Sequence, residues 1–287
     1  MVTGSRGVIG QEVCKLLADA GFKVTGSRRI HQGQSKLPEV VLDPWTTIET
    51  FGAKFDAIIH LAGEYSNDLG LSRQSSIFNS NLGLAASISE LLVSQPVPVI
   101  AVGSYFESAM KENQPWSYYS ISKIAARDLL VRGCTRSQVQ LDYVFLYDTY
   151  GGSRNRMKFI DQLVNAYDQG LSLPASFGEQ VLNLTHVADV AGFLVNLLSK
   201  PKNYTWQIRY SQIKSDETYT LREIAKIAQE TFGYEIEIHW GDFPYRDREV
   251  FRLWDCAPNL TSFEKKYTLH KYLSELTSKI SEDQQIE

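Results

Sequence analysis

The residues Ser104, Tyr119 and Lys123 could together move a proton onto or off an alcohol oxygen. Ser104 ends the apolar run V-I-A-V-G-S, which is typical of a buried strand. A helix is predicted to open near Ser117, and residues four apart on a helix share one face, so Tyr119 lies next to Lys123. A nearby Lys ammonium lowers the pKa of a phenol, and a Ser hydroxyl can hold a carbonyl oxygen. We therefore expect proton transfer here while a cofactor moves the hydride.

The Tyr-x-x-x-Lys spacing is by itself a weak signal. The chain has 15 tyrosines, so a chance pair is expected about once. The position of the Tyr119–Lys123 pair strengthens the signal, because the pair follows a strand-end serine and the chain begins with a nucleotide-binding signature.

That signature is M-V-T-G-S-R-G-V-I-G, with Gly4, Gly7 and Gly10 ahead of apolar residues at helical spacing. Glycines let the backbone approach a pyrophosphate, and a helix N-terminus supplies free N–H groups. A second strand is predicted over residues 22–26, as a βαβ dinucleotide unit requires. A Gly-rich turn without a ligand is the alternative. Because only three residues precede Gly4, the first strand is short or begins upstream.

Arg28 and Arg29 follow the second predicted strand and bear on the choice of cofactor. A site selective for NAD would place an acid here to bind the ribose hydroxyls, whereas an Arg suits the 2′-phosphate of NADP. The pair therefore favours NADPH, with NADH also possible; the alternative is a pair of solvated loop arginines.

Strands and helices alternate through the first half of the chain, which predicts a Rossmann-like, doubly wound parallel sheet. His60, inside an apolar strand, is interpreted as a packed core histidine. Ligands of such sheets lie at the carboxyl ends of the strands, where Gly4, Gly63, Ser104 and Asp148 are expected. The predicted strands cover 40–43, 56–63, 97–102 and 139–147, and the helices cover 74–92 and 117–130.

Beyond residue 150 the alternation becomes irregular, which predicts a smaller α/β substrate-binding lobe. We expect an NAD(P)-binding domain at 1–150, completed by about 181–200, and the lobe mainly at 151–287. Helices are predicted at 157–167, 189–198, 220–232 and 267–280, and strands at 182–187, 205–209 and 235–240.

The composition excludes several classes of protein. A net charge of -4 without long charged runs makes nucleic acid or an anionic membrane an unexpected partner. Three cysteines far apart in sequence suggest reduced thiols in a cytoplasm and no disulfide frame. The five histidines and three cysteines form no ligand cluster, so no metal is expected.

Together these motifs resemble the extended short-chain dehydrogenase/reductase family, which includes the NAD-dependent epimerases and dehydratases. The resemblance rests on T-G-S-R-G-V-I-G, I-I-H-L-A-G, G-S-Y-F-E, D-T-Y-G and L-T-H-V-A-D-V. It implies that Ser104, Tyr119 and Lys123 are the catalytic triad. It implies cofactor contacts for Tyr119, Lys123, Gly4, Arg6, Gly7, Val8, Ile9, Gly10, Arg28, Arg29, Asp43, Leu61, Ala62, Gly63, Asn81 and Thr149.

Within this family the chain most resembles the bacterial CDP-sugar 4-ketoreductases of the abequose and paratose synthase type. The stretches G-S-Y-F-E, L-Y-D-T-Y-G and F-P-Y-R-D-R-E-V-F-R suggest this branch. The chain departs from the wider family in the short segment of fourteen residues between Ser104 and Tyr119, in Ser108 where Tyr is common, and in lacking the Trp-x-Pro. The resemblance implies substrate contacts for Ser104, Tyr105, Asp148, Arg156, Lys158 and Arg246.

Three functions follow from this resemblance. The first is NADPH-dependent reduction of a 4-keto deoxyhexulose linked to CDP, dTDP or GDP, in bacterial O-antigen and other surface-polysaccharide synthesis. The second is an epimerase or dehydratase that retains NAD, and the third is a non-catalytic nucleotide sensor. Dehydration is disfavoured because Tyr105 and Phe106 stand where the family's dehydratases have their acid and base. Glu107 cannot stand in for Phe106, because adjacent side chains on a segment predicted to be extended point in opposite directions.

The resemblance also implies a homodimer, in which the helix from Gln74 and the helix of Tyr119 pair with their copies. Candidate residues for the seam are Ile77, Leu84, Ala126 and Leu130, with burial in the chain's own core as the alternative.

Overall fold

A computed structural model describes residues 1–30, 32–33, 35–48, 52–66, 70–112, 117–152, 158–199, 206–246, 249–258 and 265–284. The chain divides into two compact units. Unit 1 comprises Met1–Leu146, Val190–Ile213 and Asp255–Thr261, and unit 2 comprises Tyr147–Asp189, Lys214–Trp254 and Ser262–Glu287.

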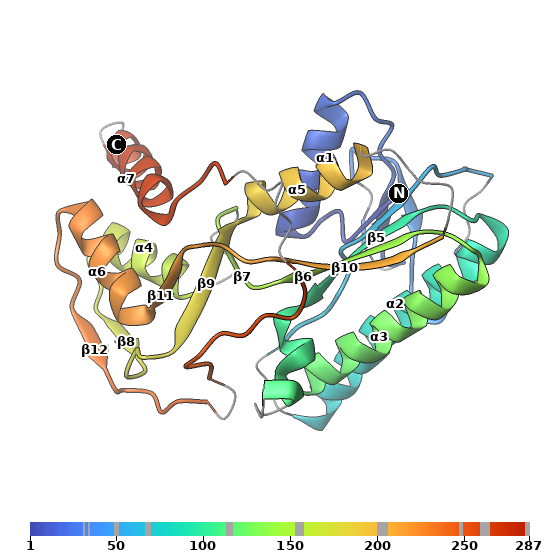
Figure 1. Cartoon of the computed structure of the whole chain (residues 1–287). Coiled ribbons are helices and arrows are strands. Elements are labelled where there is room, and N and C mark those ends of the chain that lie inside the picture. Colours follow the sequence, from blue (N-terminus) through green and yellow to red (C-terminus); the bar gives the residue numbers. More distant parts are fainter. Residues whose placement is uncertain are drawn as a thin grey trace. The chain divides into compact units, whose positions relative to one another are not determined.

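Unit 1 contains a seven-stranded sheet in which every pairing is parallel (Figure 1). The strand order β10-β6-β5-β4-β1-β2-β3 reverses direction between β1 and β4, which creates the crevice where doubly wound sheets bind ligands. The strands are β1 (Val2–Thr3), β2 (Gly26–Arg28), β3 (Glu39–Val41), β4 (Ile58–His60), β5 (Val99–Ser104), β6 (Leu141–Leu146) and β10 (Ile208–Ile213).

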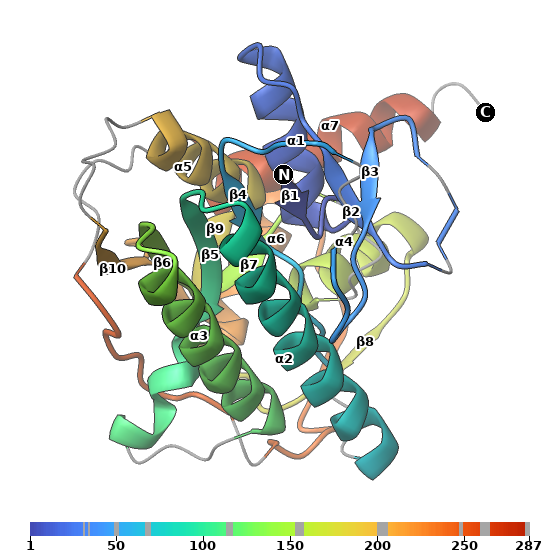
Figure 2. The same ribbon diagram turned by 90° about the vertical axis from the view of Figure 1, so that its right-hand side faces the viewer.

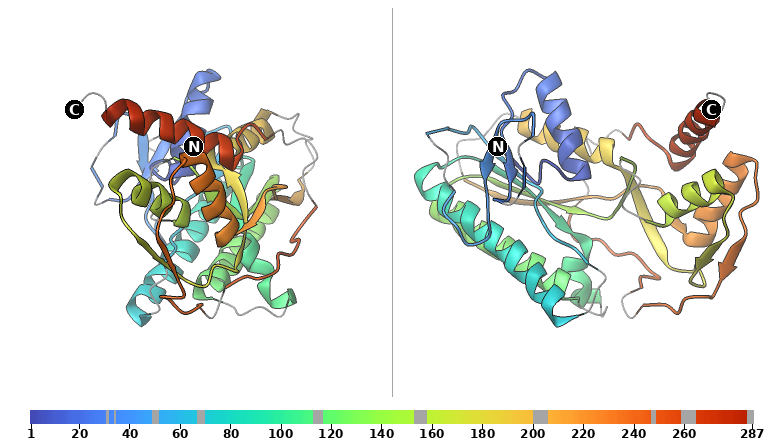
Figure 3. Two further views of the ribbon diagram at one scale, coloured as in Figure 1. Left: turned by 90° about the vertical axis from the view of Figure 1, so that its left-hand side faces the viewer. Right: turned by 180° about the vertical axis from the view of Figure 1, so that it is seen from behind.

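Helices cover both faces of this sheet (Figure 2). Helix α1 (Val8–Asp19) and helix α5 (Val187–Ser199) lie on one face, and α2 (Leu71–Ser94) and α3 (Tyr118–Arg136) lie on the other. Helices α2 and α3 run side by side along their length, as Figure 3 shows. Buried apolar residues of both helices, such as Ile88 and Leu130, form the core with strands β4 to β6.

Unit 2 has a three-stranded sheet of β7 (Asp148–Tyr150), β9 (Val181–His186) and β11 (Thr218–Thr220), and a two-stranded sheet of β8 (Leu173–Ala175) and β12 (Ile238–Trp240). Its helices are α4 (Phe159–Gln169), α6 (Leu221–Phe232) and α7 (Leu269–Gln284). A capping box between Thr220 and Glu223 fixes the start of α6. The unit has its own core, which includes Leu163, Leu184, Ala228 and Leu273.

The doubly wound parallel sheet is confirmed, and the short first strand is present as the two residues of β1. The second strand was placed too early, because β2 begins at Gly26, where the predicted strand ends. Gly26 pairs with Val2 of β1, and a Cβ on Gly26 would lie 2.6 Å from the Ser5 hydroxyl oxygen, so this close approach favours glycine. The short strands β8 and β11 were not predicted.

Two further expectations need correction. The segment after Ser104 is the 3-10 helix η1 (Tyr105–Glu112) and is not extended, which changes the direction of Glu107. The predicted seam residues Ile77, Leu84, Ala126 and Leu130 are at most 4% exposed within unit 1, so they belong to its core and cannot meet a second copy. Met157 and Thr205, at the starts of two predicted elements, lie outside the described residues.

Over the part of the chain that the structure describes, none of the helices combines the length and the hydropathy that crossing a membrane requires.

Candidate active site

The structure brings Ser104, Tyr119 and Lys123 together at the carboxyl end of β5. Ser104 is the last residue of the strand, and Tyr119 and Lys123 lie one turn apart on α3. Helix α3 begins there because Ser117 is its N-cap, with reciprocal hydrogen bonds between Ser117 and Ser120. The Ser104 side chain lies near enough to the Tyr119 hydroxyl to oppose the rise in the pKa of that phenol. A donor and a holder for one substrate oxygen therefore stand side by side.

Lys123 is buried behind this pair, and its Nζ donates to the Val102 carbonyl at 2.9 Å. A Cβ on Gly63, in the turn after β4, would lie 3.9 Å from the same Nζ and 3.5 Å from Asn81 Oδ1. The ammonium thus reaches the turn at which the resemblance places the cofactor.

Asn81, at 2% exposure, ties that turn to α3. Its Oδ1 accepts the Glu64 backbone N–H at 2.7 Å, and its Nδ2 donates to the Ser122 hydroxyl at 2.9 Å. Ser122 in turn donates to the Tyr119 carbonyl at 2.8 Å. A single buried amide therefore holds the turn and helix α3 at a fixed spacing.

The expected lowering of the Tyr119 pKa by Lys123 is wrong for this structure. Burial raises the pKa of Tyr119, the negative charge of Glu107 raises it further, and the Ser104 hydrogen bond opposes this. Burial lowers the pKa of Lys123, and Glu107 opposes that shift. The prediction counted only the attraction between ammonium and phenolate, while the cost of burying charge is the larger effect. Tyr119 therefore rests as a protonated acid.

The sequence reasoning considered Glu107 only as a substitute for a dehydratase acid or base and gave it no role at this site. It is 5% exposed and lies in η1, directly after β5. Its carboxylate accepts the Ser104 backbone N–H at 2.9 Å and the Tyr143 hydroxyl at 2.8 Å. A charged residue directly after the apolar run V-I-A-V-G-S-Y-F was the available signal.

His60 is 3% exposed, and its Nδ1 is hydrogen-bonded to the Thr3 hydroxyl at 2.7 Å. Burial, with the nearby charge of Lys123, lowers the pKa of His60 to about 3, so the ring is neutral. This confirms its interpretation as a packed core histidine.

The Gly-rich turn after β1 has the close backbone approach that a dinucleotide site requires. Gly4 has a φ of +68°, and a Cβ there would lie 2.8 Å from the Ala62 backbone nitrogen. A Cβ on Gly10 would overlap the Gly4 carbonyl. Val8 and Ile9 open α1 directly after Gly7, so free N–H groups of the helix face this turn. Leu61 and Ala62 of the neighbouring turn both donate to Thr3, by backbone N–H groups.

The charged residues predicted to meet the adenosine half of the cofactor all have protein partners. Arg6 forms a bidentate pair with Glu39, with 2.6 Å between Nη2 and Oε2, and it also donates to the Gly33 carbonyl. Asp43 accepts the Ile30 backbone N–H at 3.3 Å.

Arg28 and Arg29 differ in what they contact. The Arg28 guanidinium donates to carbonyls of its own loop, including Gln32 at 3.2 Å. The Arg29 guanidinium donates to the Ser80 hydroxyl at 2.9 Å and to Glu64 at 3.3 Å. Arg29 is therefore the one of the two that is held beside the cofactor turn.

Several predicted substrate and cofactor residues belong to unit 2. Asp148 accepts the Asn183 backbone N–H at 3.3 Å, and burial raises its pKa to about 6 against the opposing charge of Lys158. Lys158 donates to the Thr149 carbonyl at 2.8 Å, and Arg246 is exposed. Arg156 lies outside the described residues.

Tyr105 is 3% exposed and packs against Phe106, with 4.2 Å between ring centroids. Its ring is thus core, which leaves the predicted substrate contact to its edge or backbone. Within the described ranges, no group of three His, Cys, Asp or Glu side chains is arranged to hold a metal ion.

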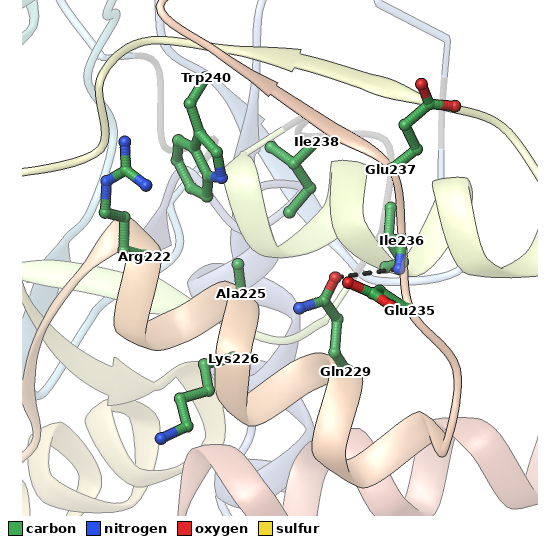
Figure 4. A pocket seen from close by; sticks show the side chains of 9 residues that line it. All are labelled: Arg222, Ala225, Lys226, Gln229, Glu235, Ile236, Glu237, Ile238 and Trp240. Carbon is green, nitrogen blue, oxygen red and sulfur yellow. Dashed lines mark hydrogen bonds between the residues drawn. The ribbon is translucent and has the colours of Figure 1, made fainter.

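A surface hollow of about 590 Å³ lies in unit 2 between α6 and β12 (Figure 4). Gln229 accepts the Ile236 N–H at 2.9 Å, and Arg222 covers the Trp240 ring at 4.5 Å. The hollow includes none of the predicted site residues, and its polar groups serve packing.

Known proteins are similar to this chain in sequence and in fold. Residues 1–208 match the NAD dependent epimerase/dehydratase family. The chain is 28% identical to the CDP-abequose synthase of Yersinia pseudotuberculosis over 234 residues, which are 78% of this chain and 77% of that protein.

Two solved structures illustrate the similarity of fold. The first is MoeE5 in complex with UDP-glucuronic acid and NAD, with a TM-score of 0.78, 20% identity, and coverage of 97% of this chain and 98% of that one. The second is UDP-glucuronic acid 4-epimerase from Bacillus cereus, in complex with the same two ligands, with a TM-score of 0.80, 15% identity and 98% coverage of both chains. At these identities the structures show the fold, whereas the match over residues 1–208 shows the family. The chain therefore belongs to the NAD-dependent epimerase/dehydratase family and is an NAD(P)-dependent enzyme of the extended short-chain dehydrogenase/reductase type.

Proposed function

We propose that this enzyme reduces the 4-keto group of a nucleotide-linked deoxyhexulose with NADPH. The observation that carries the proposal is the placement of Ser104 at the end of β5 close to Tyr119 and the buried Lys123 of α3. The 28% identity to a CDP-abequose synthase supports the substrate class.

The bound cofactor would supply the hydride, and the chain supplies everything that concerns the proton. The Ser104 hydroxyl holds the substrate oxygen, and Tyr119 gives its phenolic proton to that oxygen as charge develops on it. Reduction needs an acid, and burial keeps Tyr119 protonated. Lys123 favours this transfer because its ammonium stabilises the phenolate that is left behind.

The residues after Ser104 argue against dehydration. Elimination of water beside a ketone needs an acid for the leaving hydroxyl and a base for the neighbouring proton. Tyr105 is largely buried in the core and Phe106 cannot ionise. Glu107 is engaged by the Ser104 N–H, the Tyr143 hydroxyl and Arg127.

A 4-epimerase with retained NAD is the second candidate function. The observation in its favour is that Glu64 already neutralises Arg29, the arginine expected to meet a 2′-phosphate. A non-catalytic nucleotide sensor is the third, and the presence of Ser104, Tyr119 and Lys123 together disfavours it because a sensor has no use for a proton donor.

A substrate panel tests these three functions. Purified protein is incubated with CDP-, dTDP- and GDP-linked 4-keto-6-deoxy sugars and NADPH, and loss of NADPH absorbance is followed. The proposal expects one NADPH consumed per sugar reduced. Inversion of a nucleotide hexose without net loss of NADPH would establish the epimerase instead. NADPH binding without turnover of any sugar would support the sensor.

We also propose a homodimer, with its seam reassigned to the exposed side of α2 and α3. Half-buried apolar residues recur there every four positions on each helix, and residues at this spacing share one face. A hollow of about 440 Å³ beside Phe78 and Leu82 adds apolar surface. The seam residues are Phe78, Leu82 and Ala86 on α2, and Ile121, Ala125 and Leu129 on α3.

A further inference from the structure

Glu107 is a carboxylate at 1% side-chain exposure beside the candidate triad. A buried charge costs several kcal/mol unless partners compensate it. Three donors surround this one: the Ser104 backbone N–H at 2.9 Å, the Tyr143 hydroxyl at 2.8 Å and the Arg127 guanidinium at 3.3 Å. All three donate, which is the environment that an ionised carboxylate requires.

The backbone around Glu107 is shaped to receive it. The side chain returns from η1 to the end of β5, where Oε1 accepts the Ser104 N–H. A Cβ on Gly103 would overlap both Glu107 Oε1 and the Tyr143 ring, so only glycine leaves room at this position. The hydrogen bond fixes the residue that carries the Ser104 hydroxyl.

Charged and titratable groups from several elements face this carboxylate. From α3 come Lys123, Arg127 and Tyr119, and from β6 comes Tyr143. Burial raises the pKa of Glu107, while the charge of Lys123 and the bonds from Ser104 and Tyr143 oppose this. Further out, Asp128 pairs with Arg127, His60 is neutral beside Lys123, Tyr65 lies edge-on to Tyr119, and Tyr210 lies against Tyr143.

We propose that Glu107 is a positioning residue of this active site: it fixes Ser104 through the backbone and places a negative charge close to Tyr119 and Lys123. This inference rests on the proposed function only in using Tyr119 as the acid, and it holds equally for an epimerase. Val or another apolar residue could fill the space, but it would supply neither the acceptor nor the charge.

Two substitutions separate these roles. Glu107→Gln keeps the acceptor for Ser104 and Tyr143 and removes the charge. Because a negative neighbour raises the pKa of a phenol, its loss should move the alkaline limb of the kcat profile to lower pH, by about one unit. Glu107→Asp keeps the charge and shortens the reach, so we expect kcat to fall roughly tenfold or more with the alkaline limb in place. NADPH affinity should change little in either variant.

Asp142→Asn is the matched control. Asp142 is also a buried carboxylate of unit 1, 6% exposed, and pairs with Arg209 at 2.5 Å. This variant should lower the melting temperature and leave the pH profile unchanged. If Glu107→Gln does the same, Glu107 is a structural residue only and the proposal is wrong.

A substrate-free measurement keeps this test apart from that of the reaction. The near-ultraviolet difference between each protein and its Tyr119→Phe counterpart reports ionisation of Tyr119 during an alkaline titration. We expect ionisation at lower pH in Glu107→Gln than in the parent protein. Equal midpoints would overturn the inference whatever reaction the enzyme catalyses.

Discussion

Arg29 and Glu64 form an ion pair across the cofactor turn, with 3.3 Å between Nη2 and Oε2. The Glu64 carboxylate is 12% exposed and has a second, closer cation in Arg73 at 2.6 Å. A 2′-phosphate approaching Arg29 would therefore meet a negative charge as well as a positive one. We therefore predict that Glu64 weakens the proposed preference for NADPH over NADH.

Glu64→Gln should strengthen NADPH binding, by roughly three- to tenfold, because it removes the competing carboxylate. NADH affinity should change less, since NADH lacks the phosphate. Fluorescence titration of both cofactors measures this, with Glu90→Gln on the exposed side of α2 as the control.

The converse variant tests the same pair. Arg29→Ala should cost NADPH about 1.5–3 kcal/mol for a lost charged hydrogen bond, while Arg28→Ala, whose guanidinium serves its own loop, should cost less. If the parent protein binds NADH and NADPH equally, both arginines are only loop charges.

Tyr119→Phe should reduce turnover by a factor of about 10² or more, because it removes the proton donor. NADPH affinity should survive, since the Gly-rich turn does not involve this side chain. Lys123→Ala should lower both turnover and NADPH affinity, because the ammonium lies close to Tyr119 and near the turn of Gly63. Single-turnover rates near that of the parent protein would refute the assignment of Tyr119.

The sheet and the order of its elements could be predicted because strands and helices alternate with distinct periodicity. Strand limits were less predictable, since pairing decides them: β2 starts at Gly26 only because β1 and β3 lie beside it. The end of β6 was also hard to predict, because unit 2 begins at Tyr147, directly after this strand, and Asp148 already starts the next strand, β7.

The positions of Ser104, Tyr119 and Lys123 could be predicted from local spacing, whereas their electrostatics could not. The direction of the Tyr119 pKa depends on burial and on Glu107, which reaches it through a 3-10 turn that the sequence pattern did not indicate. Burial of Ile77 and Leu130 depends on how α2 and α3 pack together, so the exposed seam could be assigned only from the structure.

Ala125→Arg should convert the proposed dimer to a monomer, because it places a charge within the reassigned seam. Ala18→Arg, at an exposed position of α1, makes the same change elsewhere and should leave the mass unchanged. Light scattering at micromolar concentration distinguishes the two. A parent protein that is already monomeric would refute the seam.

Asp148→Asn should stabilise the protein at alkaline pH and have little effect in acid. Burial raises the pKa of Asp148 to about 6, from an ordinary value near 3.8, so the folded state binds its proton more tightly than the unfolded state does. The stability that Asp148 contributes is therefore present below about pH 4 and is lost as the pH rises through about 6, a loss of up to about 3 kcal/mol. The amide removes this loss and still accepts the Asn183 N–H.

Denaturant unfolding at about pH 4 and about pH 8 measures the difference. Asp216→Asn is the control of opposite sign, because the bond from Lys265 lowers the pKa of Asp216, so its loss should weaken the protein at the higher pH. Equal effects of Asp148→Asn at both values would mean that Asp148 is not a destabilised carboxylate.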